Sequence, residues 1–68
     1  MEIKLNNKTE HIPDYSEMSI SQLLKYKNFT FKFLAVRING KPVLTEDYDS
    51  AMIQDGDNVL VLHLISGG

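Results

Sequence analysis

The sequence contains no cysteine, and only two prolines and four glycines occur among its 68 residues. The lack of cysteine excludes disulfides and thiolate metal sites, and it gives no sign of an oxidising compartment. The sequence also lacks the roughly 20 consecutive apolar residues of a membrane span, and its polar N-terminus has no apolar signal-peptide core. We therefore expect a cytoplasmic protein without membrane association.

No lysine or arginine occurs beyond Lys41, whereas acidic residues continue. The acidic residues after that point are Glu46, Asp47, Asp49, Asp55 and Asp57. They either belong to solvated loops or form an acidic surface that steers the protein toward a basic partner. Because no basic stripe is interleaved with aromatic residues, we do not expect nucleic-acid binding.

The length of the chain limits its function. A domain of this size buries only about 60% of the surface of its unfolded chain, so its core is small. It has little room for an active-site cavity of the usual few hundred cubic ångströms. The length therefore favours a binding or carrier module over a self-sufficient enzyme.

The first half of the chain predicts a hairpin followed by a helix. Apolar and polar residues alternate at the start, and Asn6–Asn7 is a turn signal, so residues 1–12 predict a hairpin. Ser19 and Gln22 match a helix capping box, which predicts a helix over about 19–28.

The second half of the chain predicts another hairpin and a last strand. A strand at 31–39 and an edge strand at 41–44 flank Asn39–Gly40, a strong hairpin signal. A connection over 45–53 leads to an apolar strand at 59–65. The expected order is strand, strand, helix, strand, strand, strand.

The last strand is apolar on both faces, which is typical of a strand in the middle of a sheet. Leu60, Leu62 and Leu64 form one of these faces. One helix covers only one face of so small a sheet. Apolar surface near the C-terminus is then either exposed as a docking site or covered by residues 45–53.

The sequence ends with Gly67–Gly68, directly after this strand. Two glycines form a thin, flexible segment that fits a narrow cleft, and a terminal carboxylate is anionic at neutral pH. Considered alone, the pair is compatible with a chemical handle for another enzyme or with a frayed terminus.

Together these features resemble the ThiS/MoaD family of sulfur carriers, which are distant relatives of ubiquitin, and within it most closely the carriers of thiamine biosynthesis. The segments that carry the resemblance are Ile3–Asn6, Leu23–Leu24 in the helix, Val36–Gly40, Ile53–Asp57 and Ile65–Gly68. The resemblance implies an α+β fold of the β-grasp (ubiquitin-like) class, with a mixed four- to five-stranded sheet packed on one helix. The first and last strands would be adjacent and parallel, in a domain over residues 1–65 followed by a flexible tail over 66–68.

The resemblance also implies a carrier protein and not an enzyme. In the family, an E1-like adenylating enzyme of the ThiF type transfers AMP from ATP onto the C-terminal glycine, here Gly68. A cysteine desulfurase or another persulfide donor then supplies sulfur. The resulting thiocarboxylate would donate sulfur to a thiazole synthase of the ThiG type in thiamine biosynthesis. ATP would be the partner's substrate, and we expect no bound cofactor.

The resemblance assigns a role to each residue near the C-terminus. Gly67 and Ser66 would form the tail that enters the partner. The residues expected to dock partners are Leu60, Leu62, Leu64 and Ile65. We expect no metal site, because Asp55 and Asp57 flank a glycine that favours a turn, and two carboxylates are too few for a dedicated site.

Other functions remain open at this point. The small subunit of molybdopterin synthase and a ubiquitin-like protein modifier share the terminal diglycine and its activation, and they differ in the acceptor. An interaction domain with an inert tail is the alternative of another class.

Overall fold

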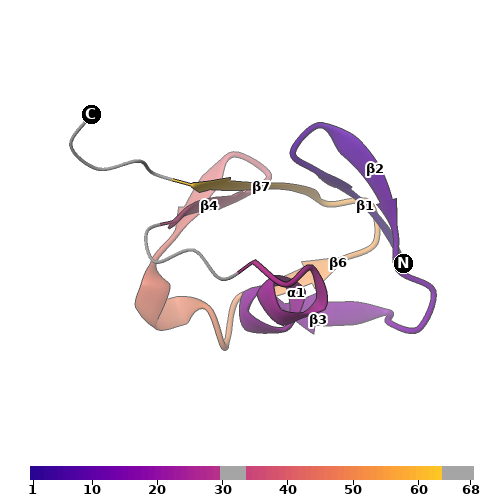
Figure 1. Cartoon of the computed structure of the whole chain (residues 1–68), viewed down its shortest axis with the longest axis horizontal. Coiled ribbons are helices and arrows are strands. Elements are labelled where there is room, and N and C mark those ends of the chain that lie inside the picture. The colour runs from indigo at the N-terminus through magenta and orange to yellow at the C-terminus, as the bar shows by residue number, and fades with distance from the viewer. Residues whose placement is uncertain (30–33, 64–68) are drawn as a thin grey trace.

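The computed structural model describes residues 1–29 and 34–63 (Figure 1). In chain order, the elements of this part are β1 (Glu2–Leu5), β2 (Lys8–His11), β3 (Glu17–Ser19), α1 (Ile20–Tyr26), β4 (Leu34–Ile38), β5 (Lys41–Val43), the 3₁₀ turn η1 (Thr45–Asp47), β6 (Met52–Gln54) and β7 (Asn58–His63). Five strands form one sheet in the order β2-β1-β7-β4-β5, and β3 pairs with β6 in a second, two-stranded sheet.

The large sheet is mixed, as the resemblance implied. β1 and β7 pair in parallel, whereas β1–β2, β4–β5 and β4–β7 are antiparallel pairs. β7 lies in the middle of this sheet, which confirms the position predicted from its apolar sequence. Pro42 lies on the edge strand β5, where a missing N–H is tolerated.

The helix α1 begins with the predicted capping box. The Ser19 hydroxyl accepts a hydrogen bond from the backbone N–H of Gln22 at 3.1 Å, and the Gln22 side chain accepts one from the backbone N–H of Ser19 at 2.8 Å. The helix ends at Tyr26, somewhat before the predicted end. Asn28 has a φ of 58°, a left-handed conformation that stops a helix.

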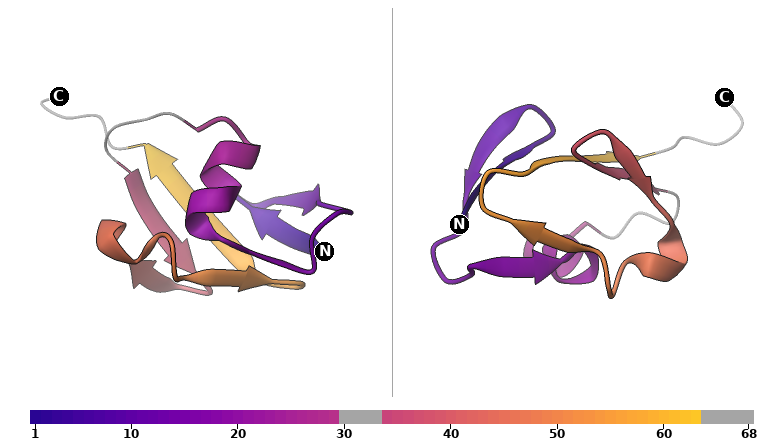
Figure 2. Two further views of the ribbon diagram at one scale, coloured as in Figure 1. Left: turned by 90° about the horizontal axis from the view of Figure 1, so that it is seen from below. Right: turned by 180° about the vertical axis from the view of Figure 1, so that it is seen from behind.

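The small sheet of β3 and β6 was not predicted. Met18 lies opposite Ile53 in this antiparallel pair, and both side chains are fully buried. β6 begins within residues 45–53, which we expected to be only a connection. The pair lies beside α1 on one side of the large sheet (Figure 2). The expected element order therefore lacked two strands.

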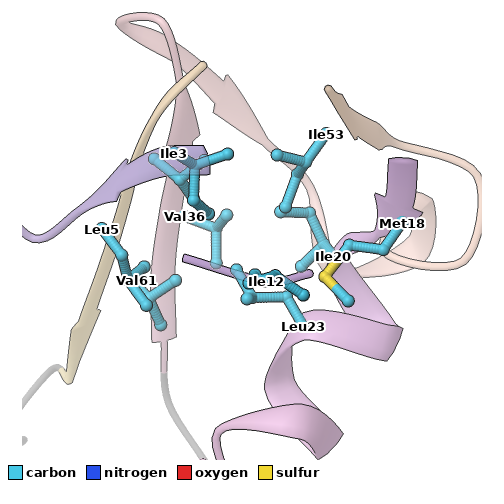
Figure 3. Packing of buried hydrophobic residues seen from close by; sticks show 10 residues of the cluster. Ile3, Leu5, Ile12, Met18, Ile20, Leu23, Val36, Ile53 and Val61 are labelled. Carbon is cyan, nitrogen blue, oxygen red and sulfur yellow. The ribbon is translucent and has the colours of Figure 1, made fainter. Parts of the chain in front are cut away.

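The hydrophobic core lies between the large sheet and the layer formed by α1, β3 and β6 (Figure 3). Its buried side chains are Ile3, Leu5, Ile12, Met18, Ile20, Leu23, Val36, Ile53, Val59 and Val61. They come from both layers, so the layer of α1, β3 and β6 covers one face of the large sheet.

The segment between β5 and β6 is attached to the start of α1. The backbone N–H groups of Ile20 and Ser21 donate to the carbonyl oxygens of Ala51 and Tyr48, at 3.0 and 2.9 Å. These bonds satisfy two of the N–H groups that a helix start leaves without an intrahelical partner. The segment is thereby fixed on the helix side, and it does not cover the opposite face of the large sheet (Figure 1).

Candidate functional site

The uncovered face of the large sheet contains two of the predicted docking residues. Along β7, Val59 and Val61 are buried on the helix side, whereas Leu60 is half-buried and Leu62 is 48% exposed. We call the side to which Leu60 and Leu62 point the outer face. Exposed apolar side chains that gather on one face are typical of a docking surface.

The remaining predicted site residues lie outside the residues that the structure describes. They are Leu64, Ile65, Ser66, Gly67 and Gly68. The docking role of Leu64 and Ile65, and the tail role of the last three residues, therefore stay predictions.

The neighbouring strand β4 extends the apolar surface of the outer face. Leu62 lies opposite Ala35, and Leu60 lies opposite Arg37. Residues that lie directly opposite each other in an antiparallel pair have side chains on the same face of the sheet. Ala35 is half-buried and Arg37 is exposed, so this row contains apolar surface beside one positive charge.

The edge strand β5 adds a third row to the outer face. Pro42 lies opposite Arg37. Leu44 has an extended backbone, with φ −74° and ψ 149°, so strand alternation places it on the same face as Pro42 and leaves it 60% exposed. We call the combined surface the outer patch, and its members are Ala35, Arg37, Pro42, Leu44, Leu60 and Leu62.

Arg37 is the charged member of the outer patch. Among the described residues, the amine of Lys27 lies 2.9 Å from the carboxylate of Glu10, and the imidazole of His11 lies 3.8 Å from the carboxylate of Glu2. Among residues 1–29 and 34–63, Arg37 therefore has no ion-pair partner. A guanidinium in this position is available to an acidic group of a docking protein.

The start of β7 follows a turn formed by Asp55, Gly56 and Asp57. The carboxylate of Asp55 accepts the backbone N–H of Glu2 at 2.7 Å, and that of Asp57 accepts the backbone N–H of Gln54 at 2.9 Å. Gly56 has a φ of 88°, which glycine adopts easily because it has no Cβ. These contacts confirm the predicted turn and connect it to β1.

Two findings on the same described part of the chain concern metals and membranes. Its His, Cys, Asp and Glu side chains include no group of three that could hold a metal ion. Its α-helix is too short to cross a membrane.

Comparison with protein families matches residues 2–68 to the ThiS family. The chain belongs to the ThiS family. Membership confirms the resemblance that the sequence segments indicated, and it supports a sulfur-carrier role. A search of curated protein sequences gave no significant match.

Two solved structures are similar to this chain over its full length. The crystal structure of the thiamine biosynthesis protein ThiS from Geobacter metallireducens has a TM-score of 0.90 and 25% identity, with 100% of both chains covered. The solution NMR structure of a thiamine biosynthesis protein from Geobacter metallireducens has a TM-score of 0.80 and 25% identity, and the match covers 100% of this chain and 88% of that one. These similarities confirm the β-grasp fold.

The sequence did not indicate all members of the outer patch. It assigned docking to β7 and its continuation, but the outer patch also contains Ala35, Arg37, Pro42 and Leu44. Alternation along each strand indicates which side chains share a face. It does not give the order or the register of the strands, and these decide which residues become neighbours.

Proposed function

We propose that this ThiS-family protein is a sulfur carrier of thiamine biosynthesis, and that it carries sulfur as a thiocarboxylate on Gly68. The family match over residues 2–68, which includes Gly67–Gly68, is the observation that supports this function most directly. The protein would act as a substrate of partner enzymes and would not itself catalyse a reaction.

The proposed chemistry begins with activation of the Gly68 carboxylate. A carboxylate resists nucleophilic attack because its negative charge is delocalised over both oxygens. In an E1-like adenylating enzyme of the ThiF type, a carboxylate oxygen would attack the α-phosphorus of ATP. Pyrophosphate would leave, and an acyl-adenylate with a good leaving group would form.

Sulfur transfer would follow from a cysteine desulfurase or another persulfide donor. The terminal sulfur of the persulfide attacks the carbonyl carbon of Gly68, and AMP leaves. A thiolate then attacks the inner sulfur of this acyl persulfide and cleaves the S–S bond that came from the donor, which leaves the thiocarboxylate on the carrier and a disulfide on the donor side. The thiocarboxylate sulfur is the nucleophile that a thiazole synthase of the ThiG type would use.

The carrier would position the Gly68 carboxylate and allow it to reach the partner's active site. Gly67 has no side chain, so the segment that ends at Gly68 can enter a narrow active site. Docking of the folded domain would hold the carboxylate at high effective concentration beside ATP. The carrier would need no bound cofactor or metal, and we propose that it functions in the cytoplasm.

We propose that the adenylating enzyme docks on the outer patch. Leu60 and Leu62 belong to β7, and the chain continues from β7 toward Gly68. A partner that holds the outer patch is therefore placed to receive the residues that follow. Fully burying a leucine side chain contributes about 1.5–3 kcal/mol, so the exposed surface of Leu44 and Leu62 is a substantial source of binding energy.

Intact-mass spectrometry tests the proposed function. The protein would be incubated with ATP, a ThiF-type adenylating enzyme and a persulfide donor. We expect a mass increase equal to the exchange of one oxygen for sulfur, and a fragment spectrum that places it on Gly68. A variant without Gly68 is the control and should stay unmodified. An unchanged mass of the full chain would contradict the proposal.

The identity of the acceptor separates the proposed function from related ones. Capture of binding partners on the loaded protein should recover a thiazole synthase. Recovery of a molybdopterin synthase large subunit would indicate the other sulfur-carrier pathway. A ladder of covalent conjugates would indicate a ubiquitin-like modifier.

A further inference from the structure

Two asparagines hold the two ends of β7 by the same kind of hydrogen bond. The side-chain oxygen of Asn39 accepts the backbone N–H of Asn58 at 2.8 Å, and the side-chain oxygen of Asn6 accepts the backbone N–H of Val61, also at 2.8 Å. Both asparagines have a φ of 52°, a left-handed conformation that asparagine tolerates better than most residues. Asn39 thus acts at the start of β7, and Asn6 acts toward the end that leads to Gly68.

Asn6 stands where β1 leaves β7. The register of the parallel pair joins Lys4 to Asn58 and Leu5 to Val59. The backbone N–H of Asn6 then donates to the carbonyl oxygen of Val59 at 2.9 Å. After this point the chain turns toward β2, so the side chain of Asn6 provides the next acceptor in place of a further β1 residue.

Because of the bond from Asn6, β7 has a neighbour on both of its edges at Val61. On one side, β4 pairs with β7 along its length, and Val36 lies opposite Val61. On the other side, the described partner of the Val61 N–H is the Asn6 side chain. Val61 separates Leu60 from Leu62, which are the two β7 members of the outer patch. The bond therefore acts between the two β7 members of the outer patch, two residues before the end of β7.

We infer that Asn6 is a positioning residue for the adenylation of Gly68. By fixing β7 at Val61, it holds the outer patch in the conformation that the adenylating enzyme binds, and it fixes the point from which the chain continues toward Gly68. This inference rests on the proposed function. A segment that is ordered before binding loses less conformational entropy when the complex forms. The effect is therefore expected on KM more than on kcat.

The variant Asn6→Gly removes the side-chain acceptor and keeps the left-handed backbone, because glycine adopts positive φ freely. The variant Asn39→Gly is the matched control. It removes the same kind of bond to the same strand, at the end remote from Gly68, and it also removes the bond that Asn39 Nδ2 donates to the Asp57 carboxylate at 3.1 Å. The variant Asn6→Asp keeps an acceptor oxygen at the same position and serves as the conservative rescue.

Each purified full-length variant is studied by two measurements. The first is amide hydrogen exchange by NMR, and the second is the steady-state rate of adenylation with a ThiF-type enzyme and ATP. In Asn6→Gly, we expect faster exchange of the Val61 N–H. We also expect KM to rise about 2- to 10-fold at unchanged kcat, the change that corresponds to one ordinary hydrogen bond. Asn39→Gly should unfold at a lower temperature with unchanged KM, and Asn6→Asp should restore KM.

Four outcomes would overturn the inference. Unchanged exchange of the Val61 N–H in Asn6→Gly would show that the bond does not hold the strand. Faster exchange with an unchanged KM would show that the bond matters only for stability, as would an equal rise of KM in Asn39→Gly. A wild-type protein that is not adenylated would overturn the proposed function and the inference with it. Slow exchange of its Val61 N–H would show that the protein is folded and that the failure lies in the proposed function.

Discussion

Arg37 lies directly opposite Leu60 across the β4–β7 pair, on the face of the sheet that α1 does not cover. A positive charge therefore lies between the apolar residues Leu60 and Pro42 of the outer patch. When a protein docks on such a surface, the guanidinium loses water and needs an anionic partner, because an unpaired buried charge is costly. The proposed adenylating enzyme should then present a carboxylate to Arg37.

Reversal of this charge is expected to weaken docking. Arg37→Glu should lower kcat/KM for adenylation about 10-fold or more, which corresponds to about 1.4 kcal/mol or more of lost binding. Lys41→Glu is the matched control, because it changes the net charge equally but lies opposite Ile38, on the helix-facing side of the β4–β5 pair. Equal losses in both variants would show that total charge matters and the position of Arg37 does not.

The apolar part of the outer patch is tested by Leu62→Glu. Leu62 is 48% exposed, so the substitution should change the unfolding temperature by only a few degrees, whereas kcat/KM for adenylation should fall about 10-fold or more. Met52→Glu is the control, since Met52 is a similarly exposed apolar residue at 42% but belongs to β6 in the small sheet. Calorimetry and initial-rate kinetics would be measured for both. A loss of rate in the Met52 variant alone would place the docking surface on the small sheet.

The width of the tail is tested by a graded series at Gly67. Deletion of Gly68 or the substitution Gly67→Phe should abolish loading with sulfur, whereas Gly67→Ala should retain part of it, because only a slender segment fits the proposed site. Intact-mass spectrometry measures loading, and circular dichroism verifies the fold. Normal loading of the deletion or of Gly67→Phe would show that the tail assignment is wrong.

The capping box is expected to contribute to stability and to have no role in docking. Ser19→Ala removes the acceptor of the Gln22 N–H at the start of α1. The expected cost is about 1 kcal/mol of the free energy of unfolding, or a fall of about 4–8 °C in Tm for a domain of this size. Ser16→Ala, at an exposed position outside the helix, is the control and should leave Tm nearly unchanged. An unaltered Tm in Ser19→Ala would contradict the assigned role.

The sequence was sufficient for the elements whose signals are local. The capping box at Ser19, the turn at Asn39–Gly40 and the alternation of β1 each depend on residues close together in the chain. The central position of β7 was also predictable, because a strand that is apolar on both faces is typical of the middle of a sheet, although the outer face of β7 is left uncovered here. The parallel pairing of β1 with β7 came from the family resemblance, since alternation does not give strand order.

The small sheet was not predicted from the sequence, and the reason is physical. β3 and β6 have only three residues each, which is too short for a period of two to stand out. Their pairing depends on the burial of Met18 against the rest of the core, and that is a long-range effect. The side-chain bond of Asn6 was not predicted for a similar reason. As a turn signal it predicted the backbone conformation correctly, but its side-chain partner, Val61, lies 55 positions away in the chain.

The place of β7 between β1 and β4 affects how the protein is made. While the ribosome has not yet released Asn58–His63, a nascent chain lacks the strand that joins the two halves of the large sheet, and the facing edges of β1 and β4 have no partner. β7 must therefore emerge from the ribosome before the sheet can close. Stalled or truncated products that lack β7 would also lack Leu60 and Leu62 of the outer patch, so a partner that binds this patch would discriminate against them before any ATP is consumed.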